Sequence, residues 1–174
     1  MALKTYTTIV THLEMTAEPQ LPQFTPAANR YALLRAVTPP VHFYRYLHDT
    51  VGEPYIWLRR KQMSDTDLLK IIHDSRVEIF ILYCDGVPAG FVELDFRNMP
   101  IADLALAGLV PEFIGRGLGA YLIGEAIKIA WSRAPDKLIV QTCTLDHPRA
   151  LPLYQRLGFT PIGREEVTLS ETTP

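Results

Sequence analysis

Three glycines at alternate positions constrain the fold of this chain more than any other feature. The segment LVPEFIGRGLGAYLIGEAIKIA, residues 109–130, places Gly115, Gly117 and Gly119 between a strand-like stretch and a long segment with apolar residues at helical spacing. Glycine disfavours helix and loses much backbone entropy on folding, so three within five positions need a structural reason. We expect either a sharp turn or a ligand that comes very close to the backbone.

A strand that enters a glycine-rich turn and then a helix creates a site for anions. The first N–H groups of the helix lack intrahelical partners, and the helix dipole adds partial positive charge there. Because glycine has no Cβ, a phosphate can reach these amides. The loop 114–120 therefore predicts a phosphorylated ligand, and a turn that only requires positive φ angles is the alternative.

Two other phosphate-binding motifs fit this loop less well. A Walker-type loop ends in Gly-Lys-Ser/Thr, whereas this loop continues as Gly-Ala-Tyr. The dinucleotide fingerprint G-x-G-x-x-A fits from Gly115 to Ala120, but it belongs after the first strand of a βαβ unit, with an acidic residue ending the next strand. Here at least four strands are expected before the loop, and Asp136 precedes the next strand. An NAD-dependent oxidoreductase is therefore disfavoured.

The remaining pattern predicts a single-domain α/β (α+β) fold. Strands are expected where β-branched and apolar residues alternate or run together: 4–15, 30–37, 77–84, 89–97, 102–110, 137–143 and 161–169. Helices are expected at apolar helical spacing: 41–52, 68–74 after the N-cap Ser64, 118–130 and 150–157. The segment 54–63 has short-strand or loop character. This order favours a central mixed, mostly antiparallel sheet flanked by helices.

Composition excludes several classes of protein. Hydrophobic residues make up 48% of the 174 residues and the net charge is −2, so neither nucleic acid nor an anionic membrane is an expected partner. The start, MALKTYTTIV, lacks the apolar core of a secretory signal, and no apolar run approaches the roughly 20 residues of a membrane span. Cys84, Cys143 and the histidines show no metal-ligand or disulfide spacing. We therefore expect a cytoplasmic protein without a metal.

Two segments together resemble motifs of the GCN5-related N-acetyltransferase (GNAT) family. In VPEFIGRGLGAYLI, Gly117 and Gly119 match the glycines of the family's Gln/Arg-x-x-Gly-x-Gly/Ala motif, with Ile114 at the Gln/Arg position. The family's second motif is Asn-x-x-Ala-x-x-x-Tyr-x-x-x-Gly-Phe, and DHPRALPLYQRLGF has these residues at its positions: His147, Ala150, Tyr154, Gly158 and Phe159. The resemblance is clear over residues 77–165.

The resemblance implies an acyltransferase that uses acetyl-CoA. The acetyl group would pass by direct attack to the primary amine of a small-molecule or peptide acceptor. The GNAT-like domain would occupy residues 30–170, after an N-terminal strand and proline-containing connector in residues 1–29, and a homodimer is compatible with it. A non-catalytic acyl-CoA-binding regulatory module of the same fold is the alternative.

The resemblance also implies where the coenzyme binds. The pyrophosphate would lie on the glycine loop: Ile114, Gly115, Arg116, Gly117, Leu118, Gly119 and Ala120. The pantetheine arm would lie along Gly108, Leu109 and Val110, where its amides can pair with the strand edge. We expect the backbone N–H of Leu109 to polarise the thioester carbonyl. An apolar central strand without this role is the alternative.

Tyr154 and Glu93 are the side chains expected to move protons. The family's matching tyrosine points at the coenzyme sulfur and protonates the departing thiolate, although the spacing of Tyr154 is otherwise typical of a core residue. Alternation in FVELDF puts Glu93 and Asp95 on one face of a strand, which is either the active-site cleft or the solvent side. Glu93 is the candidate base, and proton removal through water is the alternative.

Aromatic residues gather in PPVHFYRYLHDTVGEPYIWLRRK, where the family has the wall of its acceptor site. Tyr44, Tyr55 and Trp57 are expected to bind the acceptor together with Glu93. An acceptor that carries a ring or a carboxylate would suit the neighbouring arginines: Arg45, Arg59 and Arg60. An amphipathic helix with solvent-exposed arginines is the alternative.

Overall fold

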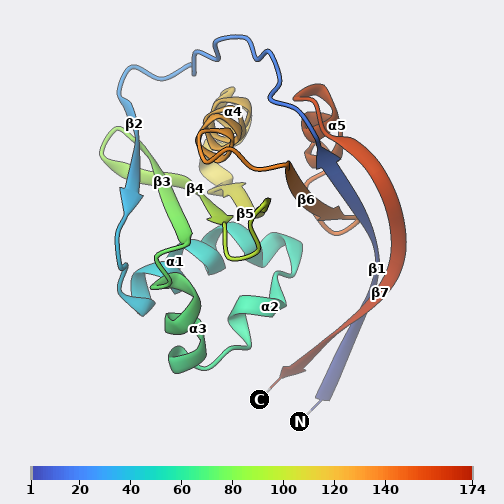
Figure 1. Cartoon of the computed structure of the whole chain (residues 1–174). Coiled ribbons are helices and arrows are strands. Elements are labelled where there is room, and N and C mark those ends of the chain that lie inside the picture. Colours follow the sequence, from blue (N-terminus) through green and yellow to red (C-terminus); the bar gives the residue numbers. More distant parts are fainter. Residues whose placement is uncertain (1, 174) are drawn as a thin grey trace.

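Seven strands form one continuous sheet in the computed structural model, which describes residues 2–173 (Figure 1). Their order across the sheet is β2 (Tyr31–Ala36), β3 (Val77–Cys84), β4 (Val87–Asp95), β5 (Ile101–Leu109), β6 (Lys137–Cys143), β1 (Ala2–Met15) and β7 (Thr160–Thr173). All neighbours are antiparallel except β5 and β6, which run parallel. The predicted mixed, mostly antiparallel sheet is confirmed.

Helices cover both faces of this sheet. They are α1 (Val41–Gly52), η1 (Glu53–Tyr55), α2 (Leu58–Lys61), α3 (Asp65–Ile72), η2 (Pro111–Phe113), α4 (Leu118–Trp131) and α5 (Ala150–Arg156). α3 begins at the predicted cap, where the Asp67 N–H donates to Ser64 Oγ at 3.1 Å. None of the helices within residues 2–173 has the length and apolarity needed to cross a lipid bilayer.

The segment 54–63 differs from the strand or loop expected there, because it is largely helical. Tyr55 and Trp57 are two positions apart, which is the spacing of side chains on one face of a strand. In the structure Ile56 adopts a left-handed conformation with φ of 59°, and the Trp57 N–H donates to Gly52 O at 3.2 Å. The chain therefore folds back beneath the end of α1 instead of extending.

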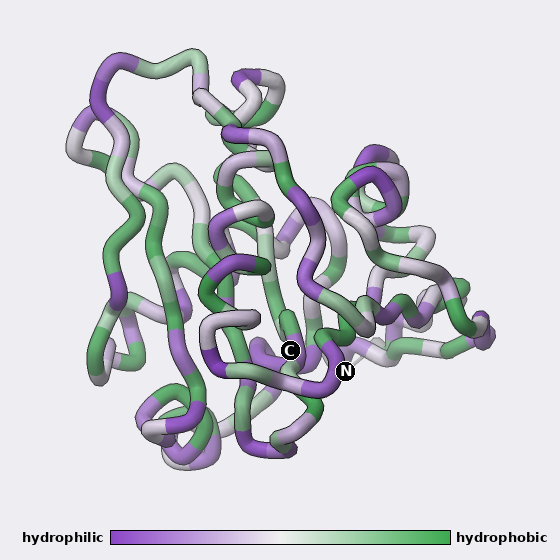
Figure 2. The backbone as a smooth tube through the Cα atoms, turned by 45° about the horizontal axis from the view of Figure 1, so that its top comes forward, coloured by the Kyte–Doolittle hydropathy of each residue, from purple (hydrophilic) through white to green (hydrophobic). Residues whose placement is uncertain are grey.

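Each face of the sheet has its own apolar core. α4 packs against one face through residues such as Leu122 and Ile127, whereas α1 and α3 cover the other face with Tyr44, Leu47 and Leu68. Seven successive residues of β4, from Ala89 to Asp95, are buried as a result. Figure 2 shows the hydrophobic residues concentrated along the central strands.

β1 lies between β6 and β7, so the strand grouped by sequence with the 1–29 connector is part of the sheet. β1 pairs with β7 from Ala2 to Glu14, and the two chain ends lie side by side (Figure 1). This ribbon is tied to the helices beside it, because Gln62 Nε2 donates to Ser170 O at 2.8 Å and Lys61 pairs with Glu171 at 3.4 Å.

Candidate functional site

β5 and β6 pair along only the first half of β5. Residues 101–104 pair with β6, whereas residues 105–109 do not and so have an open edge on that side. The separation begins at a bulge, because Leu104 and Leu106 face consecutive residues of β4 and Ala105 has no partner there. The open edge of β5 borders a cavity of about 840 Å³.

The antiparallel register determines which amides of β5 face the opening. The Val110 N–H donates to Ala89 O on β4 at 2.8 Å. Successive N–H groups of a strand point to opposite edges, so the N–H of Gly108 also points to β4. The N–H groups of Ala107 and Leu109 point the other way, and both residues line the cavity. Leu109 thus presents the backbone amide predicted from the sequence to face the coenzyme, and Ala107 presents a second amide that was not predicted.

The glycine loop borders the same cavity. Gly115 and Gly117 have φ angles of 87° and 74°, and Gly117 is the N-cap of α4. A Cβ added at either position would meet no atom within 4 Å. Within the described chain the N–H groups of residues 115–120 donate no hydrogen bond. The loop therefore combines the positive-φ turn with the open space and the unpaired amides that an anion contact requires.

Three of the residues expected to bind the coenzyme do not reach the cavity with their side chains. Leu118 and Val110 are buried in the apolar cores, and Arg116 lies over the ring of Phe113 while its Nη2 donates to Glu112 O at 3.0 Å. Arg116 and Leu118 can offer only backbone N–H groups, and the Val110 N–H is already bound to β4. The other loop residues all line the cavity: Ile114, Gly115, Gly117, Gly119 and Ala120.

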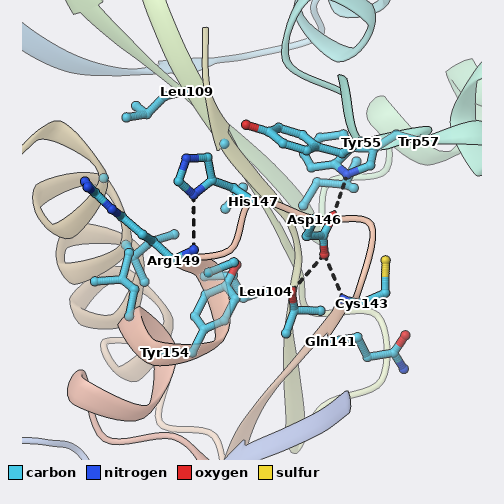
Figure 3. Close-up of a pocket in the computed structure, with 18 of the residues that line it drawn as sticks. Tyr55, Trp57, Leu104, Leu109, Gln141, Cys143, Asp146, His147, Arg149 and Tyr154 are labelled. Atoms are coloured by element: carbon cyan, nitrogen blue, oxygen red, sulfur yellow. Dashed lines mark hydrogen bonds between the residues drawn. The ribbon is translucent and has the colours of Figure 1, made fainter. Parts of the chain in front are cut away.

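Tyr154 lies on α5 at the wall of the cavity (Figure 3). Its ring packs edge-on against Phe159, with the centroids 5.7 Å apart, and only 7% of the residue is exposed. Its hydroxyl forms no hydrogen bond with any other described residue, and it is not enclosed by protein atoms. Burial, followed by the negative charge of Asp146, raises the pKa of Tyr154 above its ordinary value, so it is protonated at neutral pH. The ring of Tyr154 is thus part of the apolar core, while its hydroxyl faces the cavity.

Asp146 links the two sides of the cavity. Its Oδ1 accepts from Trp57 Nε1 at 3.1 Å, and its Oδ2 accepts from Thr142 Oγ1 at 2.8 Å and from the Cys143 N–H at 2.9 Å (Figure 3). These bonds join the end of β6 to the segment between α1 and α2, and they orient Trp57. Asp146 was not among the site residues predicted from the sequence, where its only signal was its position directly before His147 of the second motif.

Glu93 and Tyr44 lie behind the cavity and do not line it. Glu93 is 0% exposed, and its carboxylate accepts hydrogen bonds from the Tyr44 hydroxyl and from Arg60 Nη2. The face of β4 that carries Glu93 is covered by α1. This face is therefore neither of the two environments considered from the alternation, which were an open active-site cleft and the solvent side of the sheet. The structure thus places Glu93 in an enclosed pair with arginine and not on the wall of the cavity.

Another carboxylate, Asp103, does line the cavity. It lies on β5 opposite Asp95, just before the bulge. Asp95 is paired with Arg97 at 2.6 Å, whereas Asp103 has no hydrogen bond or ion pair within residues 2–173. Burial, followed by the charge of Asp95, raises the pKa of Asp103 to about 6. Asp103 was not among the site residues predicted from the sequence, although an acidic residue in the apolar stretch ADLALAGLV was a usable signal.

The side of the cavity next to α2 is lined by Tyr55 and Trp57, two of the aromatic residues expected there. Arg59 and Arg60 line it as well, and Val10 and Leu169 of the β1–β7 ribbon contribute an apolar wall. Among the described side chains, no three His, Cys, Asp or Glu residues cluster as metal ligands would.

Known proteins resemble this chain in sequence and in fold. The sequence model of the acetyltransferase (GNAT) family matches residues 42–159. An uncharacterized N-acetyltransferase of Methanocaldococcus jannaschii is 30% identical over 86 residues, which span 46% of this chain and 38% of that protein.

Two solved structures show the likeness in fold. The ribosomal-protein-S18-alanine N-acetyltransferase of Escherichia coli has a TM-score of 0.62 at 16% identity, over 83% of this chain and 96% of that one. A functionally unknown conserved protein of Staphylococcus epidermidis has a TM-score of 0.63 at 12% identity, over 96% of this chain and 62% of that one. At such identities these structures support the fold alone.

Proposed function

This chain belongs to the acetyltransferase (GNAT) family, and from that membership we propose that it transfers an acetyl group from acetyl-CoA to a primary amine. One observation carries the proposal, namely the open edge of β5 that leads into the glycine loop. Pantetheine contains amides that can pair with a strand edge, and a pyrophosphate suits the unpaired amides of residues 115–120. Both halves of the coenzyme thus have complementary partners along one cavity.

The acceptor amine must lose a proton before it can attack the thioester. An alkylammonium group has a pKa of about 10.4, so only a small fraction is neutral at pH 7. Asp103 is better suited to this step than Glu93, because its carboxylate lines the cavity, has no partner in the described chain and is ionised above a pH of about 6. Asp103 would accept the ammonium proton, directly or through water, and release it to solvent.

The neutral amine would then attack the thioester carbonyl. As the C–N bond forms, the developing oxyanion would be stabilised by the N–H of Leu109 or of Ala107, which face the opening. As the C–S bond breaks, the thiolate would take the proton of the Tyr154 hydroxyl. The phenolate would then recover a proton from the new amide nitrogen through water, which restores Tyr154 for the next turnover.

The test is a screen of amines that follows CoA release, paired with the variant Tyr154→Phe. We expect the variant to lower kcat about 100-fold, as for loss of a general acid, with little change in the affinity for acetyl-CoA. Tyr121→Phe is the matched control, since Tyr121 lies on α4 against Tyr31 and outside the cavity.

The outcomes separate the candidate functions. CoA release by wild type that Tyr154→Phe does not change would remove Tyr154 from the mechanism. A non-catalytic module would be stabilised against heat by acetyl-CoA but would release no CoA with any amine. Stabilisation by NAD instead of acetyl-CoA would indicate the oxidoreductase alternative.

A further inference from the structure

Two arginines of α2 bring positive charge to the acceptor side of the cavity. Arg59 is exposed and has no ion-pair partner among residues 2–173. Arg60 is only 7% exposed, and its Nη2 is bound to Glu93. The Nε–H of Arg60 is buried without a hydrogen-bond partner in the described structure. Because this N–H has no exposed surface, a ligand in the cavity does not reach it, and Arg59 is the arginine that remains available for pairing.

Negative charge lines the same cavity at Asp103, which does not pair with these arginines. Asp103 forms no ion pair with either of them, although the charges of both act to lower its pKa against the dominant effect of burial. Arg59 and Asp103 therefore line the same cavity without pairing with each other. A ligand with both charges can lie between them and pair with each.

The charge balance favours a single carboxylate on the ligand. Arg60 is neutralised by Glu93, so Arg59 and Asp103 contribute one positive and one negative charge. Burial lowers the pKa of His48, which also lines this side and is therefore neutral at pH 7. The other charged groups on the cavity belong to the segment from β6 to α5: Asp146, Arg149 and Arg156. A phosphate dianion would find too little positive charge here.

Building on the proposed function, we infer that the acceptor is a zwitterion of the amino acid type. Its ammonium group pairs with Asp103, and its carboxylate pairs with Arg59. Its side chain packs against the apolar wall formed by Trp57, Val10 and Leu169.

A binding experiment tests this without relying on turnover. In the presence of CoA, calorimetry compares N-acetylphenylalanine with N-acetylphenethylamine, which lacks only the carboxylate. We expect the carboxylate to tighten binding at least 10-fold, as for a charge-assisted pair. Arg59→Gln should bring the ratio of the two dissociation constants close to one. Arg30→Gln is the control, because Arg30 pairs with Asp85 on an exposed turn outside the cavity.

Kinetics with phenylalanine and phenethylamine then separate the inference from the proposed function. A carboxylate preference in kcat/KM that is lost in Arg59→Gln supports the inference. Equal binding and equal rates for the two members of each pair would overturn it while leaving acetyl transfer intact. If no amine releases CoA but the carboxylate preference in binding persists, the site is supported and acetyl transfer fails.

Discussion

Replacing Asp103 by asparagine should make the protein more stable and less active at neutral pH. The pKa of Asp103 is about 6 in the folded chain, against an ordinary value of 3.8. Each pKa unit corresponds to about 1.4 kcal/mol, so the ionised carboxylate costs the folded state about 3 kcal/mol. Asparagine has nearly the same shape and no charge, so Asp103→Asn avoids this cost.

The gain depends on pH in a direction that follows from the raised pKa. Below 3.8 the carboxyl group is protonated in both the folded and the unfolded chain, and the substitution changes little. As the pH rises from 3.8 to about 6, the unfolded chain loses the proton first, so the cost to the folded state grows. Above a pH of about 6 the cost to the folded state is constant, because the carboxyl group is ionised in both states. The gain should be about 1 kcal/mol at a pH of about 4.5 and about 3 kcal/mol at a pH of about 7.5.

Urea unfolding of wild type and Asp103→Asn at these two pH values measures the difference in free energy of unfolding. Asp95→Asn is the matched control. Burial acts to raise the pKa of Asp95, but its hydrogen bonds and ion pair with Arg97 outweigh burial and lower it. Its ionised form therefore stabilises the fold at neutral pH and is lost as the pH falls, so Asp95→Asn should destabilise the protein.

Activity gives the second half of this prediction. CoA release by Asp103→Asn should fall about 100-fold, as expected for loss of a general base. In wild type, kcat/KM should decline as the pH falls through about 6, and this decline should be absent from the residual activity of the variant. A variant no more stable than wild type at neutral pH, or a gain equal at both pH values, would refute the reasoning about Asp103.

Two other sites give predictions that rest on backbone conformation and on hydrogen bonding. Gly117→Ala should weaken CoA binding in calorimetry and cost about 1–2 kcal/mol of stability, because alanine is strained at a φ of 74°. Gly163→Ala, where a Cβ meets no atom within 4 Å, should change neither, and equal behaviour of the two variants would contradict this. Asp146→Ala should lower the unfolding free energy by about 3 kcal/mol, because three donors including Trp57 Nε1 lose their acceptor. Urea unfolding with unchanged stability would show that these bonds contribute little.

The glycine loop was predictable because its cause is local. A positive φ angle and an unobstructed backbone are properties of Gly115 and Gly117 themselves, and the helix that follows them has its own apolar spacing. The same holds for the cap at Ser64 and for the strands at residues 77–84 and 137–143, whose bounds agree with the sequence prediction.

Local sequence patterns could not show that Asp103, and not Glu93, lines the cavity. Alternation along β4 shows that Glu93 and Asp95 share a face, but it does not show that α1 covers Glu93 or that Arg60 reaches it from α2. Asp103 reaches the cavity beside a bulge at Ala105, and a bulge arises from the pairing of two strands.

By itself, the sequence determined the order of the seven strands and of helices α1, α3, α4 and α5, the position of the glycine loop and the family to which the chain belongs. Tertiary structure decided that β5 and β6 separate, that β1 lies between β6 and β7, and that Asp103 lines the cavity while Glu93 is enclosed. The physical reason is that periodicity and backbone preference act between neighbours in the chain. Burial, strand pairing and pKa depend instead on which distant segments pack together.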